Sequence, residues 1–503
     1  MTRTTAPAPA ETAGPPGPAP SSGGARRRWW TLAVISTAQL MVILDATIVN
    51  IALPAAQRDL GFSDGNRQWV VTGYALAFGS LLLLGGRIAD LFGRRATFLV
   101  GLLGFAGASA LGGAAGSFEL LVGARALQGL FGALLAPAAL SLLTVTFTDG
   151  KERAKAFGVF GAIAGAGGAI GLLLGGVLTE HLSWRWTLYV NLGFAAVAFV
   201  GGLLLLQRTP RDRSARLDVP GMVLVSVGLF DLVYGFSNAE SHSWNSPSTW
   251  GFLVGGALLL AAFAWWQTRA AHPLLPLRVL LDRTRGASFL AVLIVGAGMF
   301  GVFLFLTYYL QLTLGYSPIR TGLAFLPMVG ALMVTATLST GVLVPRFGPK
   351  PVVPLGMGIT AAGLVWLTGL GLHSDYPAHL LPPLIAVGLG IGLVIAPAMN
   401  LAVSGVAAAD AGVASATVNT MQQIGGSIGT ALLNTLAASA AHHYLAGRDP
   451  RDRAVLARAG LESYATAYWW SAGFFAVGLV ASALLYRRGR VVEDANAAPV
   501  VHF

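Results

Sequence analysis

The segment Leu44-Asp45-Ala46-Thr47-Ile48-Val49-Asn50-Ile51-Ala52-Leu53-Pro54 places a carboxylate inside the first long apolar stretch of the chain, Trp30 to Leu53. A charged side chain in the hydrocarbon of a bilayer costs about 3 kcal/mol on insertion scales, so a carboxylate at this depth indicates a function. We predict that Asp45 binds and releases a proton. A structural hydrogen bond or a position at a helix end is the alternative.

The composition is typical of a membrane protein. The 503 residues have a mean hydropathy of +0.69, and only 11% of them are charged. Apolar stretches of at least about 18 residues, each long enough to span a bilayer, recur along the whole chain. The absence of cysteine excludes thiol catalysis, disulfides and Cys-bound metals. The sequence has no phosphate-binding Walker loop and no metal-ligand cluster, so we expect no enzyme, no cofactor and no metal, and an ion or substrate gradient as the energy source.

The apolar stretches predict an all-α polytopic membrane protein with fourteen transmembrane helices. The predicted spans are 30–53, 68–88, 96–116, 119–142, 156–178, 187–207, 219–238, 249–267, 288–311, 321–344, 352–372, 380–403, 412–440 and 468–486. The pair within 219–267 has the weakest pattern, and its first helix contains a second intramembrane carboxylate, Asp231.

The basic residues predict the orientation. The net charge is +11, but the charges lie between apolar stretches and do not form the patch or tail that nucleic acid would require. Most of the 32 Lys and Arg residues fall in segments that share one side when the N-terminus is cytoplasmic. Both termini are therefore predicted to be cytoplasmic; the four arginines of loop 441–467 are the exception.

An internal repeat predicts two similar halves. Gly86-Arg87-Ile88-Ala89-Asp90-Leu91-Phe92-Gly93-Arg94-Arg95 recurs as Gly341-Val342-Leu343-Val344-Pro345-Arg346-Phe347-Gly348-Pro349-Lys350, 255 residues later. Weak internal symmetry of this kind is typical of transporters. The predicted organisation is a disordered cytoplasmic tail at 1–28, a six-helix bundle at 29–207, two linker helices at 208–285, a pseudo-symmetric six-helix bundle at 286–490 and a cytoplasmic tail at 491–503.

The first copy of the repeat is a candidate conformational latch. Gly86 and Gly93 suit a tight turn, and Asp90 can pair with Arg94, with Arg95 or with a neighbouring helix end. Such contacts would stabilise one conformation and release in the other. Plain positive-inside topology is the alternative, and it explains the arginines but not the spacing of Asp and Gly.

Arg125 is the predicted partner of Asp45 in proton coupling. It lies inside the fourth span, and Gln128 shares its helix face. Its charge could tune the proton affinity of Asp45 or meet an acidic substrate group; snorkelling to the membrane surface is the alternative.

Two further groups of residues are candidates for the transport pathway. Glycines four residues apart in the fifth span predict a close helix contact; they are Gly167, Gly171 and Gly175, with Gly176 beside them. Polar residues within the spans are candidates to line a cavity, and they are Asn50, Gln128, Tyr309, Gln311, Asn400, Asn419 and Gln422.

Together these motifs resemble the fourteen-helix drug:proton antiporter branch of the major facilitator superfamily, over nearly all of residues 28–490. Asp45 to Pro54 looks like the helix-one signature of that branch, and Gly86 to Arg95 looks like the loop motif of the whole superfamily. Arg125 with Gln128-Gly129 resembles the helix-four motif assigned to proton coupling. The other similar segments are Ser183-Trp184-Arg185-Trp186 with Asn191 near helix six, and Tyr309-Leu310-Gln311 with Gly315-Tyr316-Ser317-Pro318 and Gly322 after helix nine.

The chain departs from the branch in helix five, where the antiporter motif has proline and this chain has Leu172. Without that proline the helix keeps its backbone hydrogen bond and kinks less, which leaves room for uncoupled transport. Some members of the branch also carry an acid within helix thirteen; here the nearest is Asp410, at the inner end, and divalent cationic drugs are less favoured as substrates.

The sequence predicts a proton-coupled antiporter for multidrug or antibiotic efflux, which exports amphipathic small molecules across the cytoplasmic membrane of a bacterium. Its partners would be the small-molecule substrate, protons and the lipid bilayer, and we expect a monomer. A dedicated exporter of an endogenous metabolite is the alternative within the family. A carrier without proton coupling, or a membrane sensor, is the alternative of a different class.

Overall fold

The computed structural model describes residues 22–63, 66–147, 150–207, 218–242, 244–271, 273–275, 277–404, 406, 411–449 and 451–487. The described residues form helices and connecting turns, with no strand among them. The helices of the first half are α1 (Ser22–Leu60), α2 (Gln68–Phe92), α3 (Arg94–Gly113), α4 (Phe118–Thr146), α5 (Gly150–His181) and α6 (Trp186–Leu205). Next come α7 (Val219–His242), α8 (Pro247–Gln267) and the short α9 (Leu277–Leu280).

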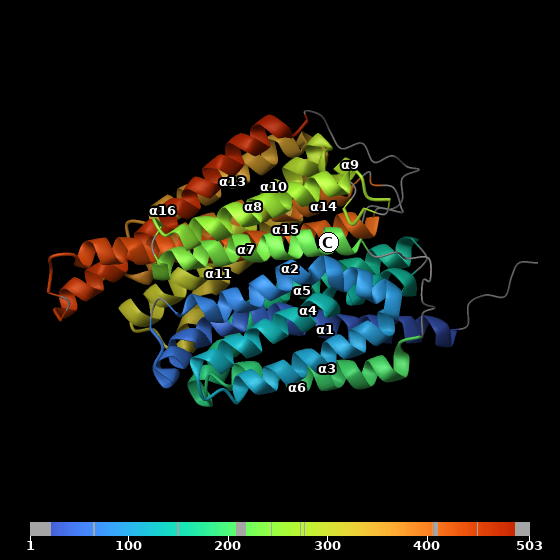
Figure 1. The fold of residues 1–503 in the computed structure, drawn as a ribbon, viewed down its shortest axis with the longest axis horizontal. Helices are drawn as coiled ribbons and strands as arrows, with labels where there is room; N and C mark the ends of the chain where they lie inside the picture. The colour runs from blue at the N-terminus through green and yellow to red at the C-terminus, as the bar shows by residue number, and fades with distance from the viewer. Residues whose placement is uncertain are drawn as a thin grey trace, which may run out of the picture.

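The second half contains three π-helical turns as well as α-helices. Its elements are α10 (Arg283–Tyr308), η1 (Tyr309–Thr313), α11 (Pro318–Leu338), η2 (Ser339–Leu343), α12 (Val344–Phe347), α13 (Pro349–Leu367), η3 (Tyr376–Leu380), α14 (Leu381–Val403), α15 (Ala411–Leu445) and α16 (Arg453–Leu485). The first six helices lie together, the helices from α10 onward lie together beside them, and α7 and α8 lie in front of the boundary (Figure 1).

The same pairs of helices pack in both halves. In the first half α1 packs against α5 and α6, and α3 and α2 pack against α4; in the second half α10 packs against α15 and α16, and α13 and α11 pack against α14. The two halves meet where α2 packs against α15 and where α5 packs against α11. In this correspondence α2 is equivalent to α11 and α5 to α15, so the α2–α15 contact is equivalent to the α11–α5 contact. The packing of the two halves therefore follows one two-fold pattern.

Glycine permits the close helix approach in both halves. A Cβ atom added to Gly85 of α2 would lie 1.9 Å from the carbonyl oxygen of Ala133 in α4. At the equivalent interface, a Cβ atom on Gly388 of α14 would lie 2.2 Å from the carbonyl oxygen of Met328 in α11. Both helix pairs therefore pack backbone against backbone, as small residues allow in membrane proteins.

The repeated loop motif forms the same turn twice. Gly93 joins α2 to α3 with φ of 96°, and Gly348 joins α12 to α13 with φ of 81°. Glycine adopts positive φ without steric cost, whereas a residue with a Cβ atom is strained there. The 255-residue offset in sequence therefore corresponds to a repeated backbone geometry.

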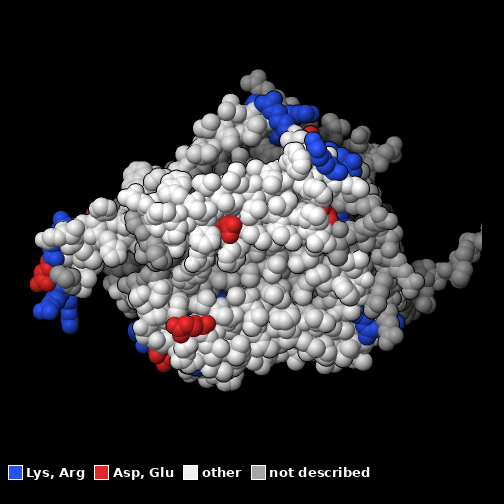
Figure 2. Space-filling model, in the orientation of Figure 1, with Lys and Arg blue, Asp and Glu red and all other residues white. Residues whose placement is uncertain are grey.

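Twelve helical segments among the described residues are long and apolar enough to cross a membrane. In α2 and α5 the described apolar segments are shorter, Trp69–Leu82 and Ile170–His181. Figure 2 shows most Lys and Arg at the left and towards the right of the molecule, with a broad surface between them that carries a few acidic and almost no basic side chains. Large apolar side chains such as Val197, Leu258 and Val477 are exposed, as expected where helices face lipid.

The hairpin of α7 and α8 is attached to both halves. The hydroxyl of Ser226 in α7 donates to the carbonyl of Ser80 in α2 at 2.7 Å, and the hydroxyl of Thr435 in α15 donates to the carbonyl of Phe236 in α7 at 3.0 Å. The hairpin thus spans the boundary between α2 and α15.

Asp218 fixes the end of this hairpin where α7 begins. Its carboxylate accepts hydrogen bonds from the side chains of Trp266 and Gln267 at 2.6 and 2.7 Å and from the backbone N–H of Gly221 at 3.0 Å. Burial alone would raise the pKa of Asp218, but the hydrogen bonds, led by that of Gln267, hold this pKa below its usual value.

Candidate functional site

Asp45 is fully buried within the first half, and three side chains from two other helices donate to it. Arg125 of α4 donates from Nη1 to Oδ2 at 2.5 Å, and Gln128 of α4 donates from Nε2 to Oδ1 at 2.9 Å. Asn191 of α6 donates from Nδ2 to the same Oδ1 at 2.7 Å. The carboxylate of α1 therefore lies in a charged hydrogen-bond network inside the bundle.

Arg125 points into the bundle and not towards the membrane surface. Its side chain is only 2% exposed. Its Nε donates to the carbonyl of Val70 at 3.1 Å, its Nη1 also donates to Oε1 of Gln128 at 2.9 Å, and its guanidinium lies 4.4 Å from the centre of the Tyr74 ring. The charge of Arg125 is thus held in place by α2 and α4 as well as by Asp45.

Ser109 of α3 holds the two amides that contact Asp45. Its Oγ lies 2.7 Å from Nε2 of Gln128 and 3.3 Å from Nδ2 of Asn191. An amide NH₂ group has two donor hydrogens, so each amide can bind Asp45 and Ser109 at once. Sequence reasoning used Asn191 only as part of the helix-six resemblance, and it missed Ser109 and Tyr74. The sequence feature that could have identified Ser109 and Tyr74 is that both are polar residues within apolar spans.

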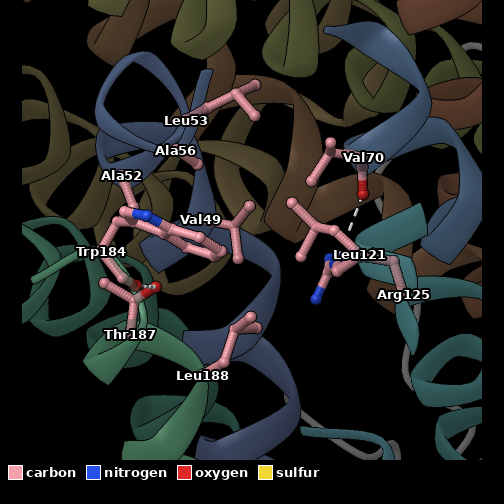
Figure 3. Close-up of a pocket in the computed structure, with 10 residues that line it drawn as sticks. All are labelled: Val49, Ala52, Leu53, Ala56, Val70, Leu121, Arg125, Trp184, Thr187 and Leu188. Atoms are coloured by element: carbon pink, nitrogen blue, oxygen red, sulfur yellow. Dashed lines mark hydrogen bonds between the residues drawn. The ribbon is translucent and has the colours of Figure 1, made fainter. Parts of the chain in front are cut away.

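A small cavity adjoins this network towards the end of the bundle where α1 ends and α2 begins. It has room for about one water molecule. Its lining residues are Val49, Ala52, Leu53, Ala56, Val70, Leu121, Arg125, Trp184, Thr187 and Leu188. Figure 3 shows the guanidinium of Arg125 beside the open space that Val49 and Trp184 border on the other side.

Beyond this cavity, an ion pair joins α1 to the α5–α6 connection. Asp59 accepts hydrogen bonds from Nε1 of Trp184, at 2.9 Å, and from Arg185. Arg185 also donates to the carbonyl of Ala115 at 2.8 Å. These contacts tie together the ends of α1, α3 and α6 on one side of the Asp45 network.

The predicted glycine face of α5 packs mainly on α1, the helix that carries Asp45. A Cβ atom on Gly171 would lie 2.0 Å from Oγ1 of Thr47, and one on Gly175 would lie 2.9 Å from the carbonyl oxygen of Ile48. A Cβ atom on Gly167 would lie 3.0 Å from the side chain of Ile43. The spacing of these glycines therefore corresponds to a close contact between α5 and α1.

Gly176 and Leu172 instead face the second half. A Cβ atom on Gly176 would lie 2.8 Å from the carbonyl oxygen of Pro318, at the start of α11. The carbonyl oxygen of Leu172 would lie 2.7 Å from a Cβ atom on Gly322. The position where the resembled motif has proline thus lies at the contact between α5 and α11.

The candidate latch residues lie around the turn between α2 and α3. Gly93 forms the turn, and a Cβ atom added to Gly86 would lie 3.7 Å from the side chain of Pro137 in α4. Arg95 donates from Nη2 to the carbonyl of Leu203 in α6 at 2.8 Å. Arg94 begins α3. The side chain of Asp90 lies outside the described part of the structure, as does Asp410.

The polar cavity candidates are dispersed between the two halves. Asn50 donates to the carbonyl of Ala46 within α1 at 3.5 Å, and the fully buried Tyr309 donates its hydroxyl to the carbonyl of Gly371 at 2.7 Å. Gln311 of η1 crosses between the halves and donates to the carbonyl of Ile51 at 3.1 Å. Three others are partly buried, namely Asn400 on α14 and Asn419 and Gln422 on α15. Only Gln128 of this predicted set contacts Asp45.

Comparison with known proteins defines the class. The sequence model of the Major Facilitator Superfamily matches residues 35–430, so the chain belongs to this superfamily. It is a multi-pass membrane transporter and not an enzyme.

The chain is similar to several named resistance and export proteins. It is 48% identical to a puromycin resistance protein of Streptomyces alboniger, over 98% of this chain and 97% of that one. It is 39% identical to a tetracenomycin C resistance and export protein of Streptomyces glaucescens, over 84% and 78% of the two chains. It is 40% identical to a cephamycin export protein of Amycolatopsis lactamdurans, over 81% and 85%.

Solved structures share the fold at low sequence identity. An auto-inhibited peptide transporter of the POT family superposes with a TM-score of 0.67 at 18% identity, covering 95% of this chain and all of that one. An inward-facing bacterial homologue of the human lysosomal transporter Spinster superposes with a TM-score of 0.63 at 16% identity, covering 91% and 97%. These likenesses concern the fold alone.

Proposed function

We propose that this protein is a proton-coupled antiporter that exports amphipathic small molecules, among them antibiotics, across the cytoplasmic membrane of a bacterium. The observation that carries the proposal is the buried pair of Asp45 and Arg125, which lies inside the first half of a transporter fold. A carboxylate at this depth needs a partner when it is charged, and it can exchange that partner for a proton.

The proposal includes a fourteen-helix architecture. The helices α2 and α5 are 25 and 32 residues long, sufficient to span a bilayer in addition to the twelve candidate spans. The recurring packing pairs support bundles at 29–207 and 286–490 joined by a linker at 208–285. The basic residues support cytoplasmic termini, and the connection between α1 and α2 then lies on the outer side. We propose that one chain forms the transport unit.

In the proposed cycle, Asp45 alternates between an ionised form paired with Arg125 and a protonated form released from it. Separating the pair with no proton bound would leave an uncompensated charge in the bundle, which is strongly unfavourable. Proton binding removes the penalty on Asp45, and the charge of Arg125 keeps the Val70 carbonyl, Oε1 of Gln128 and the Tyr74 ring as partners. Separation of the pair and protonation of Asp45 therefore occur together. Proton entry from outside can thus be coupled to a change in the packing of α1 against α4 and α6.

Asn191 suits both forms of Asp45. Its Nδ2 donates to the ionised carboxylate, while its Oδ1 is buried without a hydrogen-bond partner among the described residues. A protonated carboxyl group becomes a donor, and rotation of the Asn191 amide would present Oδ1 as its acceptor. The same side chain would then satisfy Asp45 before and after it takes a proton.

Three contacts between the halves would close the outer side in this state. Gln311 donates to the carbonyl of Ile51, the backbone N–H of Ile319 donates to Oε2 of Glu180 at 3.2 Å, and the guanidinium of Arg67 lies 4.2 Å from the centre of the Tyr308 ring. Outward opening would break these contacts.

The glycine face of α5 and the proposed latch at Gly86 to Arg95, with Asp90 as its acid, would control the rate of exchange between the inward-facing and outward-facing states. The proposed cavity residues are Asn50, Tyr309, Gln311, Asn400, Asn419 and Gln422.

The relatives support the substrate class. Their names assign them puromycin resistance, tetracenomycin C resistance and export, and cephamycin export. By similarity, we propose that antibiotics of this kind are substrates. The cephamycin exporter and a probable actinorhodin transporter of Streptomyces coelicolor, 36% identical over 85% of this chain, favour a second candidate: export of one compound that the cell itself makes.

Reconstituted vesicles with a pH gradient and an internal pH-sensitive dye test the proposal. Puromycin, other antibiotics and lipophilic cations are added one at a time, and we expect at least one of them to release protons. Asp45→Asn should abolish this response, whereas Asp375→Asn, which changes an exposed carboxylate, should retain it. Proton release by folded Asp45→Asn at the wild-type rate would refute Asp45 as the coupling residue.

A further inference from the structure

Asp231 is an intramembrane carboxylate that the proposed transport cycle does not use. It lies midway along α7, between Val219 and His242, and its side chain is partly exposed. The described residues offer it no hydrogen bond and no ion pair. An acidic residue inside a membrane span normally faces the protein interior and has a partner, so Asp231 needs an explanation of its own.

Asp231 belongs to the face of α7 that is directed towards lipid. One exposed stripe of this helix runs through Val219, Val223 and Val227 at four-residue intervals, and Asp231 is the next position in the series. Ser226, which bonds to α2, lies five residues before Asp231 and about 140° from it around the helix. Figure 2 shows an isolated acidic side chain within the uncharged surface over α7 and α8, the two helices in front in Figure 1.

Three aromatic rings gather around that of Tyr234, one helical turn from Asp231. Phe230 stacks on Tyr234 with the ring centres 5.8 Å apart and the planes at 9°. Phe252 of α8 meets Tyr234 edge to face at 4.6 Å, and Trp69 of α2 lies 5.9 Å away. Phe230 is 43% exposed, so part of this aromatic surface is open to a ligand within the bilayer.

The surface of α8 beside Asp231 is bare. A Cβ atom on Gly255 would meet only Oδ2 of Asp231, at 3.7 Å, and one on Gly251 would meet nothing within 4 Å. Two glycines one turn apart therefore leave the α8 backbone uncovered between Asp231 and Phe252. A bulky group can approach the carboxylate over this part of the helix.

We propose that Asp231 and the aromatic cluster of Trp69, Phe230, Tyr234 and Phe252 bind lipophilic organic cations directly from the bilayer. The carboxylate supplies the counter-charge that hydrocarbon lacks, and aromatic faces attract cations through the ring quadrupole. Because α7 packs against both α2 and α15, the bound cation lies over the boundary between the two halves. This binding site is distinct from the Asp45 network, and its role in delivering substrate rests on the proposed export function.

Direct binding measurements test the site without requiring transport. Radiolabelled tetraphenylphosphonium is titrated onto the protein in nanodiscs of uncharged lipid, with empty nanodiscs as the blank. Asp231→Asn should weaken one saturable component about tenfold, Asp231→Glu should restore it, and Tyr234→Ala should weaken it by a smaller factor. Trp366→Ala removes a remote exposed aromatic ring on α13 and should change nothing.

Two further measurements complete the test. The first distinguishes recognition of the positive charge from apolar binding, and the second distinguishes this site from binding near Asp45. Tetraphenylborate matches the probe in shape but carries the opposite charge, so it should show no component that depends on Asp231. The component should persist in Asp45→Asn and disappear in Asp45→Asn/Asp231→Asn, which distinguishes this site from the proposed coupling residue even if no substrate releases protons. Unchanged cation affinity in Asp231→Asn overturns the proposal. If the wild-type protein forms dimers in nanodiscs and Asp231→Asn loses them with unchanged cation binding, the proposal is also overturned and the face belongs to contacts between copies.

Discussion

Asp45 and Asp231 are carboxylates near the middle of two membrane-spanning helices, yet their surroundings differ completely. Asp45 is fully buried and receives hydrogen bonds from Arg125, Gln128 and Asn191. Asp231 is partly exposed and lies beside a bare glycine of α8. We therefore propose two different purposes for the same residue type at similar depth, an internal exchangeable charge and a contact for ligands in the bilayer. Each of the following variants tests one side of this difference.

Replacing Arg125 with methionine should have the largest effect. It leaves the charge of Asp45 buried without its cationic partner, which typically costs about 3–5 kcal/mol. Thermal unfolding in detergent should show a large fall in Tm, whereas Arg320→Met, on an exposed arginine, should have little effect. Asp45→Asn/Arg125→Met removes both charges and should recover much of the loss. If Arg125→Met is as stable as Arg320→Met, Asp45 does not depend on the pair.

Replacing Asn191 with leucine should destabilise the network by about 1.5–3 kcal/mol, the usual range for a hydrogen bond to a charged group. The ionised form of Asp45 loses a donor, so thermal unfolding in detergent should show a fall in Tm. Ser109→Ala changes a residue that contacts the amides but not Asp45, and its fall in Tm should be smaller. An unchanged Tm in Asn191→Leu contradicts the role proposed for its amide.

Gly171, which packs on the helix of Asp45, and Gly255, which lies beside Asp231, provide a matched pair. Gly171→Ala introduces a Cβ atom 2.0 Å from Oγ1 of Thr47 on the Asp45 helix, and such overpacking costs about 1–3 kcal/mol. Gly255→Ala meets only Asp231 at 3.7 Å and should change stability by less than about 0.5 kcal/mol. Unfolding midpoints and initial proton-release rates of the two variants test whether the effect of Gly171→Ala exceeds that of Gly255→Ala. Equal effects would mean that the α5–α1 contact is not the tighter of the two.

Asp218 is a third type of carboxylate, hydrogen-bonded but at the end of a span, and its replacement should have a smaller effect than the replacement of Arg125 or Asn191. Its pKa in the folded protein lies below the usual value, so it stabilises the fold above the unfolded-state pKa and this contribution is lost as the pH falls through the folded-state pKa. Asp218→Asn should cost about 1 kcal/mol at neutral pH. The difference from wild type should shrink below about pH 4. If the difference in unfolding free energy between Asp218→Asn and wild type is the same at neutral pH and below about pH 4, the lowered pKa of Asp218 does not contribute to stability.

Much of the architecture could be predicted from the sequence. Long apolar stretches determine helices because the backbone must satisfy its own hydrogen bonds in lipid, and twelve of the expected spans meet the length and hydropathy criteria within the described residues. The loop repeat was visible as glycines 255 residues apart, and both form turns with positive φ. The spacing of Gly167, Gly171 and Gly175 placed them on one face, but not against a particular helix.

The candidate site was only partly predictable. Asp45 and Arg125 stood out because charge is rare in apolar stretches, and the structure places them 2.5 Å apart. Asn191 is 146 residues from Asp45 in sequence, and an asparagine in a span has no sequence signal that names its partner. Likewise, nothing in the sequence indicated that aromatic rings of α2 and α8 would pack against Tyr234 near Asp231.

The sequence by itself determined a helical membrane protein with two similar halves and two carboxylates in its spans, because hydropathy and charge act locally along the chain. Only the tertiary structure decided that one carboxylate is enclosed by α3, α4 and α6 while the other faces outward beside bare glycines. The physical reason is that the energy of a buried charge depends on the donors and solvent around it, and these come from helices far apart in the sequence.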